Sequence, residues 1–311
     1  MSWTRYASRA SQLLLLLLAG QLLYAQRSVN VLRTAYLPEH AAGSREVALR
    51  EAENFTFDRN LIFFEALVNG EPGTFILDTG APTLVVNNRG EATHGSNYEG
   101  FGSGGSVELS DHRVEAFEMS GLSIQNYWAI GLDLRSMESR TGQRIDGMVG
   151  YDLLNDGELR IDYASRSFRL LPSERRPAHQ GVEPRAVLRF SLVDHLPVVR
   201  LRINGKRYDF AIDTGAGSNL VDEHVAAELD LTATGEGMNI QGLDGRSVDA
   251  DLVTLALPAE FAGGRDDIHL VTMDLSHLGD NGQRLAGILG SAFLSQYTIG
   301  IDYRRRRIYV W

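Results

Sequence analysis

Two Asp-Thr-Gly-Ala tetrapeptides are the residues of this 311-residue chain that could act together in a reaction. One runs from Asp78 to Ala81 and the other from Asp213 to Ala216, and each follows a short apolar run. A strand that ends in Asp-Thr-Gly places a carboxylate at the rim of a sheet, on a tight turn that glycine permits. One such turn is ordinary, since Asp and Gly favour turns in general. Two of them in equivalent places are a candidate pair of acids.

Paired carboxyl groups have a specific chemistry. At a separation of about 3 Å they cannot both ionise, so they share one proton near the working pH. The ionised partner can act as a general base on water, while the protonated partner polarises a carbonyl and later donates to the leaving amine. This arrangement hydrolyses an amide without a metal or a covalent intermediate. We therefore predict that Asp78 and Asp213 are catalytic, and we predict no metal and no cofactor.

The two acids belong to a longer internal repeat. Residues 61–87 align without a gap with residues 196–222, at an offset of 135. Further along the offset becomes 140, where Ile161-Asp162-Tyr163 matches Ile301-Asp302-Tyr303. This period is longer than the roughly 20–50 residues of a solenoid unit, so it indicates a duplicated domain. Two copies packed about a pseudo-twofold axis would bring the two Asp-Thr-Gly loops together.

The pattern within each copy is mainly that of β-strands. The apolar runs Leu61–Val68 and Pro197–Ile203 both end in Asn-Gly, which is the strongest short signal for a hairpin. The return strands are expected over Thr74–Leu77 and Tyr208–Ile212. Helical pattern is sparse, and its best stretch is Asp222–Leu229, with Asp222 as the N-cap. The sequence therefore predicts an all-β fold with few short helices.

Segment boundaries follow from composition. Residues 1–25 have the pattern of an export signal, because two arginines precede a leucine-rich run and Ala25 offers a cleavage point. The run is shorter than the ~20 apolar residues that span a bilayer, and the alternative is an uncleaved anchor. The other segments are an N-terminal segment (26–52), the first copy (53–172), a polar linker with several prolines (173–184) and the second copy (185–311).

Composition narrows the class of protein further. The chain has no cysteine, which excludes disulfides and thiol nucleophiles. Its formal net charge of −10 disfavours nucleic acid as a partner, because phosphate binding needs a concentrated basic face. With the export signal, these features predict a periplasmic or secreted protein that does not associate with the membrane once the signal is cleaved.

The motifs together resemble those of the aspartic peptidases. Each Asp-Thr-Gly-Ala follows a Phe and apolar residues, and Met148-Val149-Gly150 and Ile288-Leu289-Gly290 are similar to the apolar element that crosses behind the catalytic loop in that family. The chain looks like two retropepsin-like β-barrel domains fused into one pepsin-like bilobal chain. The resemblance implies a monomeric aspartic endopeptidase with an intramolecular site, acting on polypeptide in an extended conformation.

The same resemblance implies supporting roles within the two loops. Thr79 and Thr214 would brace the loops through hydrogen bonds across the axis, and Gly80 and Gly215 would permit the turns.

The residue after each Asp-Thr-Gly departs from the family pattern. Many pepsin-like enzymes have Ser or Thr there, whereas this chain has Ala81 and Ala216, as retropepsin-like enzymes do. Loss of a hydroxyl donor leaves a carboxylate less acidic, which predicts a pH optimum in the mildly acidic to neutral range.

A glycine-rich segment in each copy matches the hairpin that closes over the substrate in this family. Mobile hairpins of this kind suit a lid. The candidate flap or substrate-binding residues are Tyr98, Phe101, Gly102 and Gly242. The alternative for Tyr98 and Phe101 is that they are ordinary hairpin residues without a contact to substrate.

A second class of function fits the same fold. The chain could be a catalytically silent module that binds peptides or proteins, since fold alone does not fix function. Both acids are retained, and a module without turnover has no physical need for two carboxyls at one crowded site. This retention favours the enzyme.

Overall fold

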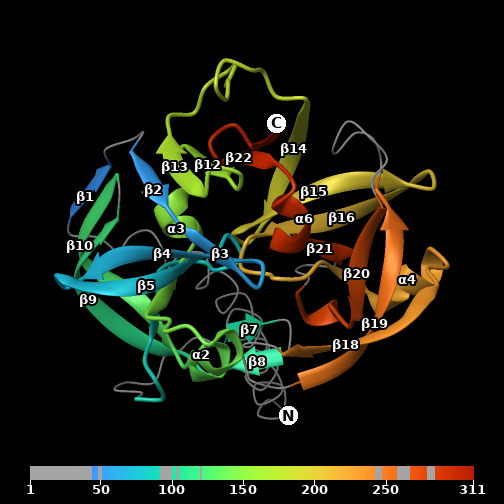
Figure 1. Cartoon of the computed structure of the whole chain (residues 1–311), viewed down its shortest axis with the longest axis horizontal. Helices are drawn as coiled ribbons and strands as arrows, with labels where there is room; N and C mark the ends of the chain where they lie inside the picture. The colour runs from blue at the N-terminus through green and yellow to red at the C-terminus, as the bar shows by residue number, and fades with distance from the viewer. Residues whose placement is uncertain are drawn as a thin grey trace, which may run out of the picture. The chain divides into compact units, whose positions relative to one another are not determined.

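The structure is a computed structural model that describes residues 44–47, 51–91, 100–102, 105–119, 121–241, 247–257, 267–278 and 284–311. These residues belong to one compact unit, Ala42–Trp311. Strands dominate it and the helices are short (Figure 1), so the predicted all-β class is confirmed. The predicted signal over residues 1–25 lies outside the described residues, as does much of segment 26–52.

The first copy of the repeat, called lobe 1, contains a closed six-stranded β-barrel. Each strand pairs with the next, and the last strand pairs back with the first. Closure leaves no edge to attract other chains. Around the barrel the order is β4 (Leu61–Val68), β5 (Glu71–Leu77), β11 (Gly147–Val149), β6 (Val85–Asn87), β10 (Leu122–Leu132) and β9 (Ser110–Met119).

The second copy, lobe 2, repeats this order of strands. Its register also repeats, because Phe63 opposes Ile76 in lobe 1 and Val198 opposes Ala211 in lobe 2. The duplication is thus present in three dimensions. The strands of lobe 2 run in the order β15 (Leu196–Ile203), β16 (Lys206–Asp213), β21 (Gly287–Gly290), β17 (Leu220–Asp222), β20 (Asp267–Met273), β19 (Ser247–Ala256) and β18 (Ala233–Gln241).

Both predicted Asn-Gly hairpins are confirmed. Asn69 and Gly70 join β4 to β5 with φ of 52° and 82°, and Asn204 and Gly205 join β15 to β16 with φ of 49° and 81°. Two successive positive φ angles are the mark of a type I′ turn, which Asn-Gly favours. The return strands β5 and β16 are longer than predicted. Their first residues are exposed and lack an apolar pattern, so the sequence did not indicate that these residues belong to the strands.

A joining sheet, which is continuous with the strands of lobe 2, connects the two lobes. Its central strands, β12 (Glu158–Asp162) and β22 (Thr298–Asp302), are equivalent segments of the repeat and pair antiparallel, with Arg160 opposite Gly300. These two positions are equivalent at the offset of 140, so the pseudo-twofold axis passes between them. The sheet order is β14 (Ala186–Val193), β23 (Arg307–Val310), β22, β12, β13 (Ser167–Leu171) and β2 (Ala52–Asn54).

Part of the predicted N-terminal segment belongs to these sheets. β1 (Ser44–Val47) adds to β10 of lobe 1, and β2 forms the end of the joining sheet. The repeated aspartates of the joining sheet serve its turns, since Asp162 accepts from the backbone N–H of Ala164 at 3.0 Å and Asp302 from that of Arg305 at 2.9 Å.

The helices of the described residues are short. Asp222 caps the predicted helix, accepting from the backbone N–H of His224 at 3.1 Å, and this prediction is confirmed. None of the described helices is both long and apolar enough to cross a bilayer. They are α2 (Arg135–Thr141), α3 (Tyr151–Leu154), α4 (Glu223–Glu228), α6 (Ser291–Leu294) and the 3₁₀ helix η1 (Ser276–Leu278).

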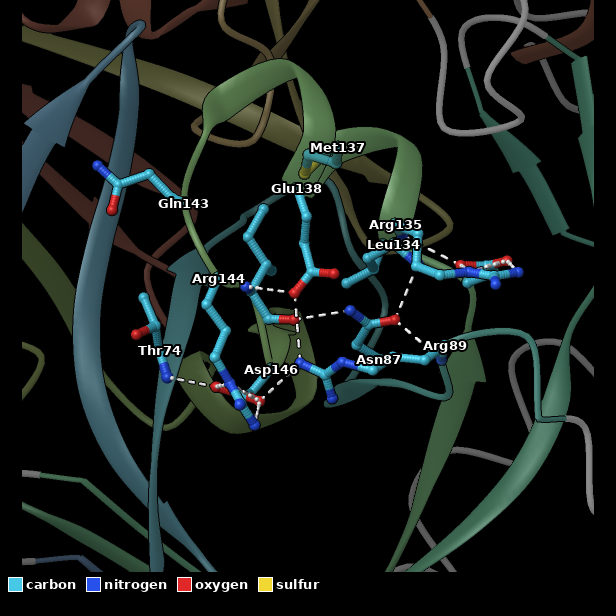
Figure 2. A network of polar contacts seen from close by, with 12 residues as sticks. Thr74, Asn87, Arg89, Leu134, Arg135, Met137, Glu138, Gln143, Arg144 and Asp146 are labelled. Carbon is cyan, nitrogen blue, oxygen red and sulfur yellow. Dashed lines mark hydrogen bonds and ion pairs between the residues drawn. The ribbon is translucent and has the colours of Figure 1, made fainter.

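A polar network fixes α2 to the barrel of lobe 1 (Figure 2). Asp146 accepts from the backbone N–H of Thr74 at 3.0 Å, from Arg89 at 3.0 Å and from Arg144 at 2.8 Å. Arg89 also reaches Glu138 of α2 at 3.3 Å. Burial raises the pKa of Asp146, but the hydrogen bonds from Arg144, Thr74 and Arg89 outweigh it and hold that pKa below the ordinary value.

In both lobes a polar side chain at the end of a short strand accepts a hydrogen bond from the backbone of a distant segment. Asn87 at the end of β6 accepts from the backbone N–H of Leu134 at 3.0 Å, as Figure 2 shows. Asp222, at the matching place in lobe 2, accepts from the backbone N–H of Leu275 at 3.1 Å. These side chains fix the chain segments that leave the two strands β10 and β20.

We expect Asp146→Asn to lower the free energy of unfolding by about 1–3 kcal/mol at pH 7, because it removes a charged acceptor shared by two arginines. A carboxyl whose folded pKa is depressed contributes stability above its unfolded pKa and loses it as the pH falls. The difference from wild type, measured by urea unfolding, should therefore stay constant from pH 7 to about pH 5 and shrink only below that, as the carboxyl takes up a proton. Glu71→Gln, at an exposed hairpin position, is the control and should match wild type. A difference independent of pH would contradict the assignment.

Candidate active site

The two Asp-Thr-Gly loops meet between the lobes. β5 leads into Asp78 and β16 ends at Asp213, and each carboxyl lies against the glycine of the opposite loop. A methyl group on Gly80 would lie 2.5 Å from Oδ2 of Asp213, and one on Gly215 would overlap the carboxyl of Asp78. Only glycine leaves room for the two acids. The structure thus brings together the aspartates that the sequence analysis selected.

The threonines of the loops bond across the axis. The backbone N–H of Thr79 donates to Oγ1 of Thr214 at 3.0 Å, and that of Thr214 donates to Oγ1 of Thr79 at 3.0 Å. Each hydroxyl in turn donates to the opposite strand, from Thr79 to the Ile212 carbonyl at 3.2 Å and from Thr214 to the Leu77 carbonyl at 2.8 Å. Both threonines are 0% exposed. The four bonds hold the acids at a fixed separation.

The loop backbones solvate the carboxyl groups. Oδ1 of Asp78 accepts from the N–H of Gly80 at 2.8 Å and of Ala81 at 3.1 Å, and Oδ1 of Asp213 accepts from the N–H of Gly215 at 2.8 Å. These donors favour the ionised form of each carboxyl. They replace part of the water that the acids lose on burial.

Burial dominates the electrostatics of the pair. It raises the pKa of Asp78 well above 3.8, and the charge and hydrogen bond of Asp213 raise it further, against the N–H donors of Gly80 and Ala81. Burial also raises the pKa of Asp213, opposed by its hydrogen bond with Asp78. The two groups titrate as one coupled unit. They are arranged to share a single proton above the pH at which free carboxyls ionise.

The apolar elements behind the loops approach them closely. The backbone N–H of Tyr151 donates to the Ala81 carbonyl at 2.9 Å, and that of Ser291 donates to the Ala216 carbonyl at 2.9 Å. A side chain at the preceding Gly150 or Gly290 would overlap these same carbonyls. The predicted apolar-apolar-Gly elements therefore support Ala81 and Ala216 from behind.

Two polar residues beside the loops were missed by the sequence analysis. His195 Nε2 lies 2.7 Å from the Gly80 carbonyl, and Asn60 donates to the Gly217 carbonyl at 2.9 Å. The two positions are equivalent at the offset of 135, each directly before its aligned apolar strand. Their equivalent positions in the repeat were the only sign in the sequence that Asn60 and His195 could lie beside the loops, because neither residue belongs to a recognisable motif.

The predicted flap is only partly described. Phe101 and Gly102 lie in β7 (Gly100–Gly102), which pairs with β8 (Gly105–Val107) as a hairpin, and Cα atoms of β7 come within 8 Å of η1 in lobe 2. Tyr98 and Gly242 lie outside the described residues. Contact between these residues and a substrate stays a prediction.

We expect Thr79→Val to lower the free energy of unfolding by about 1–3 kcal/mol, because it leaves the Thr214 N–H and the Ile212 carbonyl buried without their partner. Thr79→Ser keeps the hydroxyl and is the matched control. Urea unfolding at pH 6 gives the comparison. Equal losses in both variants would show that the methyl group matters and the hydrogen bonds do not.

The dyad should also impose a pH dependence on stability. A carboxyl whose folded pKa is raised makes the folded state bind more protons, so stability falls as the pH rises through that interval. Relative to the double variant Asp78→Asn/Asp213→Asn, which keeps no carboxyl at this place, the wild type should lose about 1 kcal/mol per pH unit above pH 4, until the shared proton is released. Asp230→Asn removes an exposed charge and should leave the slope unchanged in urea unfolding. Parallel curves for wild type and the double variant would contradict a shared proton.

Comparison with known proteins agrees with this geometry. The family model described as "Aspartyl protease" matches residues 64–153 and 199–293, one segment in each lobe. Each segment contains one of the two Asp-Thr-Gly loops. No curated protein matches the chain. The family model matches more than half of the residues of this chain, and the chain therefore belongs to the aspartyl protease family.

Proposed function

We propose that this chain is an active aspartic endopeptidase that hydrolyses peptide bonds. The observation that carries the proposal is the pair of buried carboxyls, each placed over the glycine of the opposite loop. Keeping two acids at such a place costs free energy, and strongly perturbed acid pairs are characteristic of functional sites. A binding module gains nothing from that cost.

The reaction needs only water and the two carboxyls. One proton is shared between Asp78 and Asp213, and a water molecule lies between them. The ionised carboxyl removes a proton as the water oxygen bonds to the peptide carbonyl carbon, and the other carboxyl gives its proton to the carbonyl oxygen. The C–N bond then breaks as the amine takes the proton of the protonated carboxyl, while a hydroxyl of the tetrahedral intermediate returns its proton to the other carboxylate, and a carboxylic acid and an amine leave. The dyad ends with one proton, ready for the next cycle.

The proposed substrate is a polypeptide in an extended conformation. An extended chain can add to exposed hairpins as a further strand, with backbone hydrogen bonds for affinity and side-chain pockets for selectivity. The β7–β8 hairpin of lobe 1, near η1 of lobe 2, supports such a groove. Because each lobe supplies one acid, a single chain forms the whole dyad, and we propose a monomer. We propose export to the periplasm or the medium from the signal pattern of residues 1–25.

We expect the full-length chain, expressed with its export signal, to cleave an unfolded protein best at mildly acidic to neutral pH. The raised pKa of the dyad keeps one proton on it at pH values at which free carboxyls are ionised. The pH optimum is therefore expected above the strongly acidic range. Asp78→Asn and Asp213→Asn should each lower the rate at least about 100-fold, the smaller end of the loss for a general acid or base. Digestion between pH 3 and pH 8 is the measurement, with Asp230→Asn as the control.

One result would contradict the predicted pH optimum, and another would contradict the peptidase itself. An optimum below about pH 3 would mean that the carboxyls are more acidic than free ones. A wild type that is folded by circular dichroism and binds peptides without cleaving them would identify the silent binding module instead.

A further inference from the structure

A histidine of lobe 2 contacts the catalytic loop of lobe 1. His195 lies in the turn between β14 and β15, and its Nε2 is 2.7 Å from the carbonyl oxygen of Gly80. A carbonyl oxygen only accepts hydrogen bonds, so Nε2 carries the proton in this contact. Burial lowers the pKa of His195, which favours the neutral ring.

The contacted carbonyl is linked directly to a catalytic carboxyl. The Gly80 carbonyl and the Ala81 N–H belong to the same peptide group, and that N–H donates to Oδ1 of Asp78 at 3.1 Å. A donor on the carbonyl oxygen polarises the peptide and strengthens the bond made by its N–H. The relay therefore runs from His195 in one lobe to Asp78 in the other.

The opposite side of the axis lacks this alignment. Asn60 occupies the position equivalent to His195, but it donates to the Gly217 carbonyl at 2.9 Å. The N–H of that peptide group belongs to Ser218, whereas the loop donors to Asp213 are the N–H groups of Gly215 and Ala216. Asn60 therefore braces the loop without polarising the peptide that donates to the carboxyl. The two sides of the dyad are chemically different.

The charged and titratable groups around His195 are few among the described residues. Asp194 precedes it in the turn, and the charges of Asp194 and Asp213 favour its protonated form, but burial outweighs them. The ring of Tyr151 lies 6.5 Å away, centroid to centroid. The neutral imidazole thus has a fixed place beside the dyad and a fixed acceptor.

We propose that His195 is a positioning residue, whose Nε2–H holds the Gly80–Ala81 peptide so that the Ala81 N–H stabilises the ionised dyad. The kinetic consequence rests on the proposed peptidase function, whereas the effect on carboxyl titration does not. His195 touches neither substrate nor the reacting atoms in this scheme.

The test compares three variants. His195→Phe keeps an aromatic ring and removes the donor, and it should raise the pH midpoint of dyad ionisation by about a few tenths of a unit, because it removes the polarisation of one hydrogen bond and leaves the bond itself in place. His195→Gln supplies a neutral N–H at a similar reach from the backbone and should restore the wild-type midpoint. Asn60→Gly, which suits the φ of 60° at that position, removes the matching bond of the other side and should leave the midpoint unchanged.

Two readouts separate the proposals. Carbon NMR titration of proteins labelled at the aspartate carboxyls reports dyad ionisation whether or not the chain is active. In the pH profile of kcat/KM, the acidic limb of His195→Phe should move upward by the same amount, with kcat lowered about twofold and KM little changed. A titration shift without proteolysis by wild type would support the role of His195 and reject the peptidase. Normal proteolysis with an unshifted titration in His195→Phe, or an equal shift in Asn60→Gly, would overturn the role of His195.

Discussion

The close approach of two buried carboxyls is the constraint on which the rest of the structure depends. Removing a carboxylate from water is costly, and placing a second one beside it is costlier still. The fold offsets this cost with backbone N–H donors on each acid and with hydrogen bonds between Thr79 and Thr214. The glycines that face the acids are part of the same solution, because any side chain there would occupy the space of a carboxyl.

The pseudo-twofold axis is fixed at two levels. The threonines bond across it beside the dyad, and Arg160 lies opposite Gly300 across it in the joining sheet. Two separate sets of bonds about one axis leave the lobes little freedom to slide at the acids. The duplicated sequence accounts for the symmetry, and single-residue differences such as His195 against Asn60 break it where the acids need different surroundings.

Much of this architecture could be predicted from the sequence. The dyad, the Asn-Gly turns and the Asp222 cap each depend on short local patterns with a direct physical cause. The sequence did not predict the pairing of β12 with β22, because strand spacing does not say which distant segments meet. It also did not predict the role of His195, whose acceptor is a backbone carbonyl 115 residues away and leaves no trace in side-chain patterns.

The dyad and the carboxyl of Asp146 respond to pH in opposite directions. The dyad prefers a low pH, because each proton lost adds charge to a buried pair whose pKa is raised. The network around Asp146 prefers a higher pH, because the pKa of that carboxyl is lowered and its bonds to Arg89 and Arg144 require the ionised form. The Asp146 network therefore contributes its full stability above the folded pKa of Asp146, and the dyad keeps its shared proton up to the pH at which that proton is released. The interval between these two limits begins under the ordinary carboxyl pKa and extends upward from it, so mildly acidic solution suits both the barrel of lobe 1 and the shared proton.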